Sequence, residues 1–190
     1  GLGDVYKRQT NQVVPLMTAL LVAVFAFQLN ASMLAPALHT MEIELNATTA
    51  QIGMTQTAFF TAAAVFALFM PRWGDLIGRR KVLVWMMIVT VIGSIVAALA
   101  TNVTMLFIGR VIQGVSGPTV ALTSVMLRQA VREEKQFAFL VGILTSVNGG
   151  IAGIDALLGG WLTDAFGFRS LFWVILSLIH ISEPTRRRGI

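Results

Sequence analysis

The 190-residue chain is 56% hydrophobic and only 12% charged, and its formal net charge is +5. A soluble globular domain carries about 25% charged residues, so this composition indicates an integral membrane protein. The chain contains no cysteine, which excludes disulfide bonds and thiolate metal ligands.

The two ends of the chain read as translated sequencing adapter. The DNA sequence GAT GTG TAT AAG AGA CAG encodes residues 4–9, and its reverse complement encodes residues 176–181. This DNA resembles a transposase adapter used for sequencing libraries. We therefore expect residues 1–9 and 175–190 to be artefacts. Residues 10–174 are then the native segment, an N-terminal transmembrane bundle cut from a longer protein.

The basic charge of the chain lies largely in those ends. Five of the 14 lysines and arginines fall there, and without the ends the net charge drops from +5 to +2. The whole-chain pI of about 10.8 is typical of nucleic-acid-binding domains, but the native segment alone lacks that charge. We expect no nucleic-acid partner.

Apolar runs of membrane-spanning length divide the native segment. A helix needs roughly 20 apolar residues to cross a bilayer, and backbone polar groups in lipid have to be satisfied within it. The sequence therefore predicts an all-α, polytopic membrane helical bundle. Five full transmembrane helices are expected at about 13–38, 50–70, 82–100, 105–127 and 137–162, with part of a sixth from residue 170.

Loop charge predicts the orientation of the bundle. Basic residues follow the second run (Arg72, Arg79, Arg80 and Lys81) and the fourth run (Arg128, Arg132 and Lys135), whereas the loops after the first and third runs carry none. Because basic loops stay inside, we expect a multi-pass protein of a bacterial inner or cell membrane with a cytoplasmic N-terminus. Arg169 is a minor exception on the outer side.

The loop at residues 75–81, D-L-I-G-R-R-K, resembles the signature loop of the major facilitator superfamily, G-x-L-a-D-r-x-G-r-k-x-x-l. Pro71 replaces the leading glycine of that motif, and Leu76 replaces a basic residue. The resemblance covers about residues 13–174 and implies the N-terminal half of a facilitator. It also implies a cytoplasmic latch that engages the other half, formed by Asp75, Gly78, Arg79 and Arg80. An ordinary positive-inside loop would explain the basic residues alone.

Other runs resemble further motifs of the superfamily. The fourth run matches l-x-x-x-R-x-x-q-G-x-g at Arg110, Gln113, Gly114 and, one place off, Gly117. The first run resembles the motif of multidrug-type facilitators, with Asn30 in place of its acid. The fifth run matches the antiporter motif only at Gly159 and Gly160, because Asp155 and Ala156 occupy its Gly-Pro positions. This departure weakens an assignment to the antiporter branch.

Glycines in the fourth and fifth runs predict close helix packing, since a residue without a side chain lets two backbones approach. The expected packing positions are Gly114, Gly117, Gly149, Gly153, Gly159 and Gly160.

Arg110 and Asp155 are the candidate proton-coupling residues. An arginine inside a span costs about 2.5–3.5 kcal/mol, and Asp155 is the only acid within a native span. Both lie roughly 10 Å from the outer face, so antiparallel helices would bring them together, with Asn30 and Gln113 alongside. A buried acid near a cation can alternate between ionised and protonated forms, as proton coupling requires. The alternatives are a permanent structural ion pair and, for Asn30, hydrogen bonding that only joins helices.

These observations predict a secondary active transporter of a small solute, proton-coupled and working by alternating access. The expected partners are the solute, protons, the lipid bilayer and a missing C-terminal half. No nucleotide-binding, metal-protease or nucleophile motif occurs in the native segment, so we expect no enzyme, cofactor or metal site. An uncoupled facilitator and a membrane scaffold or sensor without transport are the alternatives. Solute identity and direction of transport stay open.

Overall fold

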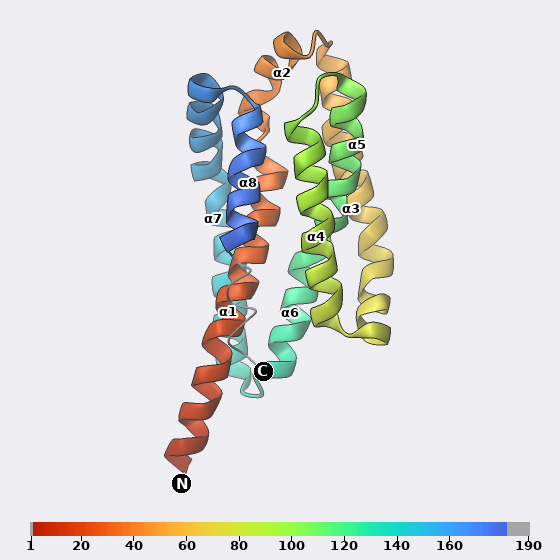
Figure 1. Ribbon diagram of the computed structural model, residues 1–190. Helices are drawn as coiled ribbons and strands as arrows, with labels where there is room; N and C mark the ends of the chain where they lie inside the picture. The colour runs from red at the N-terminus through yellow and green to blue at the C-terminus, as the bar shows by residue number, and fades with distance from the viewer. Residues whose placement is uncertain (1, 182–190) are drawn as a thin grey trace.

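The computed structural model describes the backbone of residues 2–181 and the side chains of residues 13–151 and 153–179. Over this range the structure is all-α and contains no strand. Its elements are α1 (Leu2–Ser32), η1 (Ala35–Ala37), α2 (Leu38–Glu44), α3 (Thr49–Ile77), α4 (Arg79–Ala98), α5 (Val103–Gln113), η2 (Gly114–Ser116), α6 (Thr119–Ala130), α7 (Glu134–Phe166) and α8 (Arg169–Ile181). Figure 1 shows an elongated bundle with the short α2 at one end.

Helices of membrane-spanning length confirm the predicted runs. Four segments of the described chain are long and apolar enough to cross a bilayer: Val13–Glu44, Thr49–Ile77, Arg79–Ala98 and Val103–Ala130. The two parts of α7, Glu134–Ile151 and Gly153–Phe166, meet at a bend of 40° and make a fifth span when they are counted together. The apolar part of α8, Arg169–Ile179, is shorter than a membrane span. The helices extend beyond the predicted runs because helical hydrogen bonding continues through polar residues at the ends.

Local sequence explains where the helices start and turn. Thr48 and Gln51 form a capping box at the start of α3, and the Asn102 side chain accepts a hydrogen bond from Met105 N–H at the start of α5. Gly78 joins α3 to α4 with φ of +100°, a conformation that favours glycine. The sharp turn between these two spans therefore depends on that glycine.

The bundle has two apolar clusters with polar side chains between them along α4 and α5. One cluster includes Met86 of α4, and the other includes Ala97 of α4 and Leu106 of α5. Fully buried polar residues lie between these positions, namely Thr90, Ser94, Arg110 and Gln113. Buried polar groups need hydrogen-bond partners. The middle of the bundle therefore holds a polar layer between two apolar clusters, and this layer contains the candidate functional residues Arg110 and Gln113.

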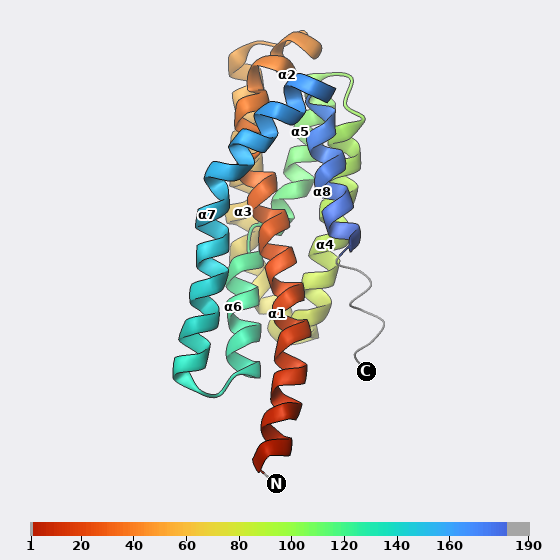
Figure 2. The same ribbon diagram turned by 90° about the vertical axis from the view of Figure 1, so that its left-hand side faces the viewer.

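The two ends of the bundle differ in charge. The α3–α4 and α6–α7 connections lie at the same end (Figures 1 and 2), which we call the basic end after Arg79, Arg80, Arg128 and Arg132. The opposite end carries α2 and is called the α2 end. Tryptophans are exposed near both, with Trp73 and Trp85 at the basic end and Trp161 at the α2 end. Aromatic residues at two levels are typical of membrane–water interfaces.

Candidate functional site

Arg110 is the centre of a buried hydrogen-bond network that joins three helices. Arg110 projects from α5 and is 0% exposed to solvent. The Nη1 group donates to the Asn30 side-chain oxygen at 2.7 Å and to Gln113 Oε1 at 2.9 Å, while Nη2 donates to Gln56 Oε1 at 2.8 Å. The guanidinium carbon also lies 4.2 Å from the centre of the Phe59 ring, a cation–π distance. Arg110 therefore links α5 to α1 and α3.

The end of α1 explains why Arg110 is needed there. The regular backbone series of α1 stops with the bond from Met33 N–H to the Leu29 carbonyl. The next two carbonyls accept from side chains instead: Asn30 O from Arg110 Nη1 at 3.1 Å, and Ala31 O from Gln56 Nε2 at 2.8 Å. Carbonyls at a helix C-terminus are unsatisfied and carry partial negative charge, which favours a cation. Arg110 and Gln56 thus cap the broken end of α1.

None of the carboxylates that the structure describes forms an ion pair with Arg110. Among the described side chains the ion pairs are His39–Glu42, Asp75–Arg79 and Glu44–Arg169, none of which includes it. Two buried donors of the network, Asn30 Nδ2 and Arg110 Nε, have no partner. The positive charge is held by carbonyl oxygens, by the end of α1 and by an aromatic ring.

Gln113 extends the network to α4. It accepts from Arg110 and donates from Nε2 to Ser94 Oγ at 2.9 Å. Asn30 and Gln113, which the sequence analysis placed beside Arg110, do contact it. Gln56, Phe59 and Ser94 were not predicted as its partners. Gln56 and Ser94 are polar residues within apolar runs, but sequence spacing cannot show toward which neighbouring helix such a side chain turns.

Asp155 forms a second polar cluster, on the other side of α1. It projects from α7, is 0% exposed and is hydrogen-bonded through Oδ2 to the Ser32 hydroxyl. Ser32 is also hydrogen-bonded to Gln28, to its carbonyl at 2.8 Å and to its Nε2 group at 3.2 Å. The Oδ1 atom of Asp155 is buried without a partner, as is Oδ1 of Asn148 on the same helix. A carboxyl group with one free oxygen can accept a further hydrogen bond or a proton.

Arg110 and Asp155 do not form the ion pair that their depth suggested. Asn30 binds the first and Ser32 binds the second, so the two groups do lie at similar depth. Positions 30 and 32 are about 200° apart around a helix, however, so they face different neighbours of α1. The predicted direct pairing is therefore wrong in this structure, and so is the alternative of a permanent Arg110–Asp155 ion pair.

Three of the six predicted packing glycines, Gly114, Gly117 and Gly159, approach a neighbouring helix closely, and Gly160 makes an ordinary contact. An added Cβ at Gly114 would lie 2.5 Å from Ala62 Cβ, and one at Gly117 would lie 2.6 Å from Ala63 Cα, so both hold η2 and its flank against α3. A Cβ at Gly159 would lie 2.6 Å from the Met33 carbonyl oxygen, and one at Gly160 would lie 3.8 Å from Pro36. At Gly114, Gly117 and Gly159 the absence of a side chain therefore lets the backbones approach, whereas Gly160 does not require it.

Gly149 and Gly153 have no close neighbour among the described residues. An added Cβ at either one has nothing within 4 Å, so packing at these two positions stays a prediction. Two other glycines, which were not predicted, also lie close to a neighbouring backbone. A Cβ at Gly93 would lie 2.9 Å from the backbone of Gln113, and one at Gly109 would lie 2.9 Å from the backbone of Ala97. They bring α4 and α5 together.

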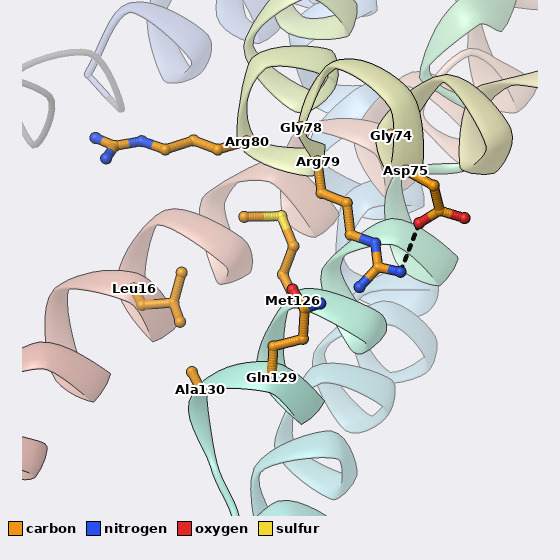
Figure 3. A pocket seen from close by; sticks show the side chains of 9 residues that line it. All are labelled: Leu16, Gly74, Asp75, Gly78, Arg79, Arg80, Met126, Gln129 and Ala130. Atoms are coloured by element: carbon orange, nitrogen blue, oxygen red, sulfur yellow. Dashed lines mark hydrogen bonds and ion pairs between the residues drawn. The ribbon is translucent and has the colours of Figure 1, made fainter.

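The loop at residues 75–81 borders an open pocket of about 530 Å³ at the basic end. Asp75 and Arg79 form an ion pair across Gly78, with 2.6 Å between Oδ1 and Nη2. Figure 3 shows Arg79 directed toward Asp75, whereas Arg80 extends away from this pair. Leu16 of α1 and the end of α6 at Met126, Gln129 and Ala130 complete the lining. The loop is thus a tight turn at Gly78 closed by an ion pair.

Comparison with known proteins identifies the family of the chain. The family model of the Major Facilitator Superfamily matches residues 20–182. The chain belongs to the Major Facilitator Superfamily. It is therefore a multi-pass integral membrane protein of a transporter family rather than a member of an enzyme family.

Relatives within the superfamily carry transporter names. The chain is 60% identical over 165 residues to the uridine/deoxyuridine transporter of Lactococcus lactis subsp. cremoris, which covers 87% of this chain and 34% of that protein. It is 33% identical over 159 residues to an uncharacterised MFS-type transporter of Mycobacterium tuberculosis, covering 84% of this chain and 23% of that protein. It is 26% identical over 175 residues to the multidrug transporter MdtP of Bacillus subtilis, covering 92% and 32%. The chain thus spans about a third or less of the length of these relatives.

Proposed function

We propose that the chain is a fragment of the N-terminal helical half of a secondary transporter that moves a nucleoside across the bacterial cell membrane. The observation that carries this proposal is the 60% identity to a uridine/deoxyuridine transporter over 165 residues. In this fold the solute site lies between two pseudo-symmetric halves. A C-terminal half of the same protein would complete the site, as the sequence analysis expected, and residues 1–9 and 175–190 would not belong to the native protein.

Uptake of radiolabelled uridine by the full-length transporter tests the solute. The protein is expressed in bacteria that lack nucleoside uptake, with the empty vector as the baseline. We expect saturable uridine uptake that unlabelled deoxyuridine inhibits and that free uracil and free ribose do not. Saturable uptake of a different solute without uridine uptake would refute the nucleoside assignment, and no uptake of any tested solute would favour the scaffold or sensor alternative.

We further propose that transport is coupled to protons and that Asp155 is the proton site. Asp155 is fully buried, has one carboxyl oxygen without a partner and has no ion-pair partner among the described residues. Intramembrane carboxyl groups are costly and mark proton or ion pathways. Arg110 contributes from the other side of α1, where its hydrogen bond to the Asn30 side chain holds the end of the helix that carries Ser32, the partner of Asp155.

A substitution pair on one helix tests the proton site. Asp155→Asn keeps the shape of the side chain but cannot release a proton, so we expect solute exchange at equal pH to continue while uptake driven by a pH gradient falls at least tenfold. Asp164→Asn is the matched control, because Asp164 is exposed on the same helix, and it should keep both activities. Gradient-driven uptake by Asp155→Asn at the wild-type rate would contradict proton coupling at this residue.

We propose that the loop at residues 75–81 is a latch that biases the conformation of the transporter. The compact Asp75–Arg79 pair and the turn at Gly78 support this role. Because the loop lies at the end of the bundle, Asp75→Asn should change the maximal rate of uptake several-fold and leave the half-saturating uridine concentration within a factor of two. Glu134→Gln, at the neighbouring connection of the basic end, is the control. Unchanged rates in Asp75→Asn would argue against a latch.

A further inference from the structure

Three polar groups converge on the Ser32 hydroxyl, and it has a single hydrogen to offer them. Its oxygen is hydrogen-bonded to the Gln28 carbonyl, to the Gln28 Nε2 group and to Asp155 Oδ2. The Nε2 group can only donate and the carbonyl can only accept. The hydroxyl can therefore donate its hydrogen either to the Gln28 carbonyl or to an ionised Asp155, but not fully to both at once.

The protonation state of Asp155 decides between the two arrangements. When Asp155 is ionised, its oxygens only accept, so the Ser32 hydroxyl donates to Oδ2 and the Gln28 carbonyl keeps only its helical bond. When a proton from bulk water binds Oδ2, the new O–H donates to the Ser32 oxygen, and the Ser32 hydrogen rotates to the Gln28 carbonyl. Release of the proton to water reverses both changes, and Gln28 Nε2 donates to Ser32 in either state.

We propose that the Ser32 hydroxyl is a two-position switch that transmits the protonation of Asp155 to the end of α1. This inference rests on the proposed proton coupling and adds a positioning residue to it. Ser32 lies in the last turn of α1, the same turn whose Asn30 carbonyl and side chain bind Arg110. A change of hydrogen bonding at Ser32 therefore acts on the helix end that Arg110 and Gln56 cap.

Charged groups that could act on Asp155 in place of Ser32 lie toward the ends of the bundle. The elements packed against α7 are α1, η1, α6 and α8. The described side chains of α1 and all of η1 are without titratable groups. Arg128 of α6 lies over the Phe137 ring, and Arg169 of α8 is paired with Glu44. The remaining charged residues of α7 are near its termini, namely Glu134, Lys135 and Asp164. Ser32 is thus the described polar partner at the level of Asp155.

Infrared difference spectroscopy on the purified full-length transporter tests the switch without requiring transport. A protonated carboxyl group has a C=O stretching band, and the band of Asp155 is the one that Asp155→Asn removes. Ser32→Ala removes a charge-assisted hydrogen bond from the ionised form of Asp155, whereas it removes only a weaker neutral hydrogen bond from the protonated form. We therefore expect the band to persist to higher pH in Ser32→Ala, by about one pH unit, and its frequency to change.

Two variants separate a switch from a structural role. Ser32→Thr keeps the hydroxyl and should restore the wild-type pH profile. Ser124→Ala is the matched control, because Ser124 makes the same bond to a carbonyl four residues earlier, at 2.8 Å to Val120 O, and it should leave the band unchanged. If Ser32→Ala does not fold, Ser32→Cys replaces it with the same expected direction, because a thiol is a weak donor.

The outcomes are distinct from those of the uptake assays. An equal pH profile in wild type and Ser32→Ala would overturn the switch, and so would an equal shift in Ser124→Ala. Absence of a titrating band that Asp155→Asn removes would also overturn it. Failure of uridine uptake with a Ser32-dependent band would instead refute the nucleoside assignment and leave the switch standing.

Discussion

Arg110 shows how a buried charge can be accommodated without a charged partner. Its guanidinium donates to oxygens of Asn30, Gln113 and Gln56 and lies over the Phe59 ring. The end of α1 adds partial negative charge at the same place. Breaking such a network by removing its cation leaves several carbonyl oxygens unsatisfied, which costs more than a surface ion pair contributes.

The similar depth of Arg110 and Asp155 could be predicted from the sequence, but the partner that each side chain binds could not. Counting residues from a helix end fixes position along the membrane normal, because each residue rises about 1.5 Å. Rotation of a helix about its axis is set by packing, which the spacing of polar residues in an almost uniformly apolar run does not specify. Asn30 was therefore placed correctly beside Arg110, whereas Ser32 was not recognised as the partner of Asp155.

Arg110→Lys tests whether the shape of the cation matters beyond its charge. A lysine ammonium carries its donors on one nitrogen and cannot reproduce the planar fork that reaches both Asn30 and Gln56. We expect the full-length protein to lose about 3 kcal/mol of stability, seen as a lower midpoint of thermal unfolding in lipid–detergent micelles. Arg128→Lys, on the basic end, should change stability by less than about 0.5 kcal/mol. Equal midpoints for the two variants would contradict the capping role of Arg110.

At the scale of helices, glycines determine how closely α5 approaches its neighbours. Gly109 and Gly93 bring α5 against α4, while Gly114 and Gly117 bring the following turn against α3. The same rule predicted packing positions in α7, where an added Cβ at Gly159 would lie 2.6 Å from the Met33 carbonyl oxygen but one at Gly149 or Gly153 would meet no described atom within 4 Å. A glycine in a transmembrane sequence permits close packing, but only the fold decides whether a neighbour lies on that side.

Gly117→Ala tests the packing of η2 and α6 against α3. Its Cβ would lie 2.6 Å from both the Cα and the Cβ of Ala63, so the backbone of α3 has to move. We expect a loss of about 1–3 kcal/mol of stability, measured by thermal unfolding of the full-length protein. Gly142→Ala is the control, because a Cβ there meets nothing within 4 Å, and alanine favours a helix over glycine by about 1 kcal/mol. A Gly117→Ala protein as stable as Gly142→Ala would refute this contact.

At the scale of the whole molecule, the sequence predicted that successive connections lie at opposite ends of the bundle, because each span carries the chain from one side of the membrane to the other. The structure places the α3–α4 and α6–α7 connections at one end and the α4–α5 and α7–α8 connections at the other, as Figure 1 shows. The loop charge then concentrates at the basic end. By the positive-inside rule we propose that this end faces the cytoplasm, together with the N-terminus of the bundle.

Single-cysteine labelling tests that orientation, and the absence of cysteine from this chain makes the background clean. Thr101→Cys places a thiol in the exposed α4–α5 connection, and Arg132→Cys places one in the exposed α6–α7 connection. In full-length protein without other cysteines, a membrane-impermeant maleimide should label Thr101→Cys in intact cells and Arg132→Cys only after permeabilisation. The reverse pattern would place the basic end outside, because labelling reports which aqueous side each loop contacts whatever the solute.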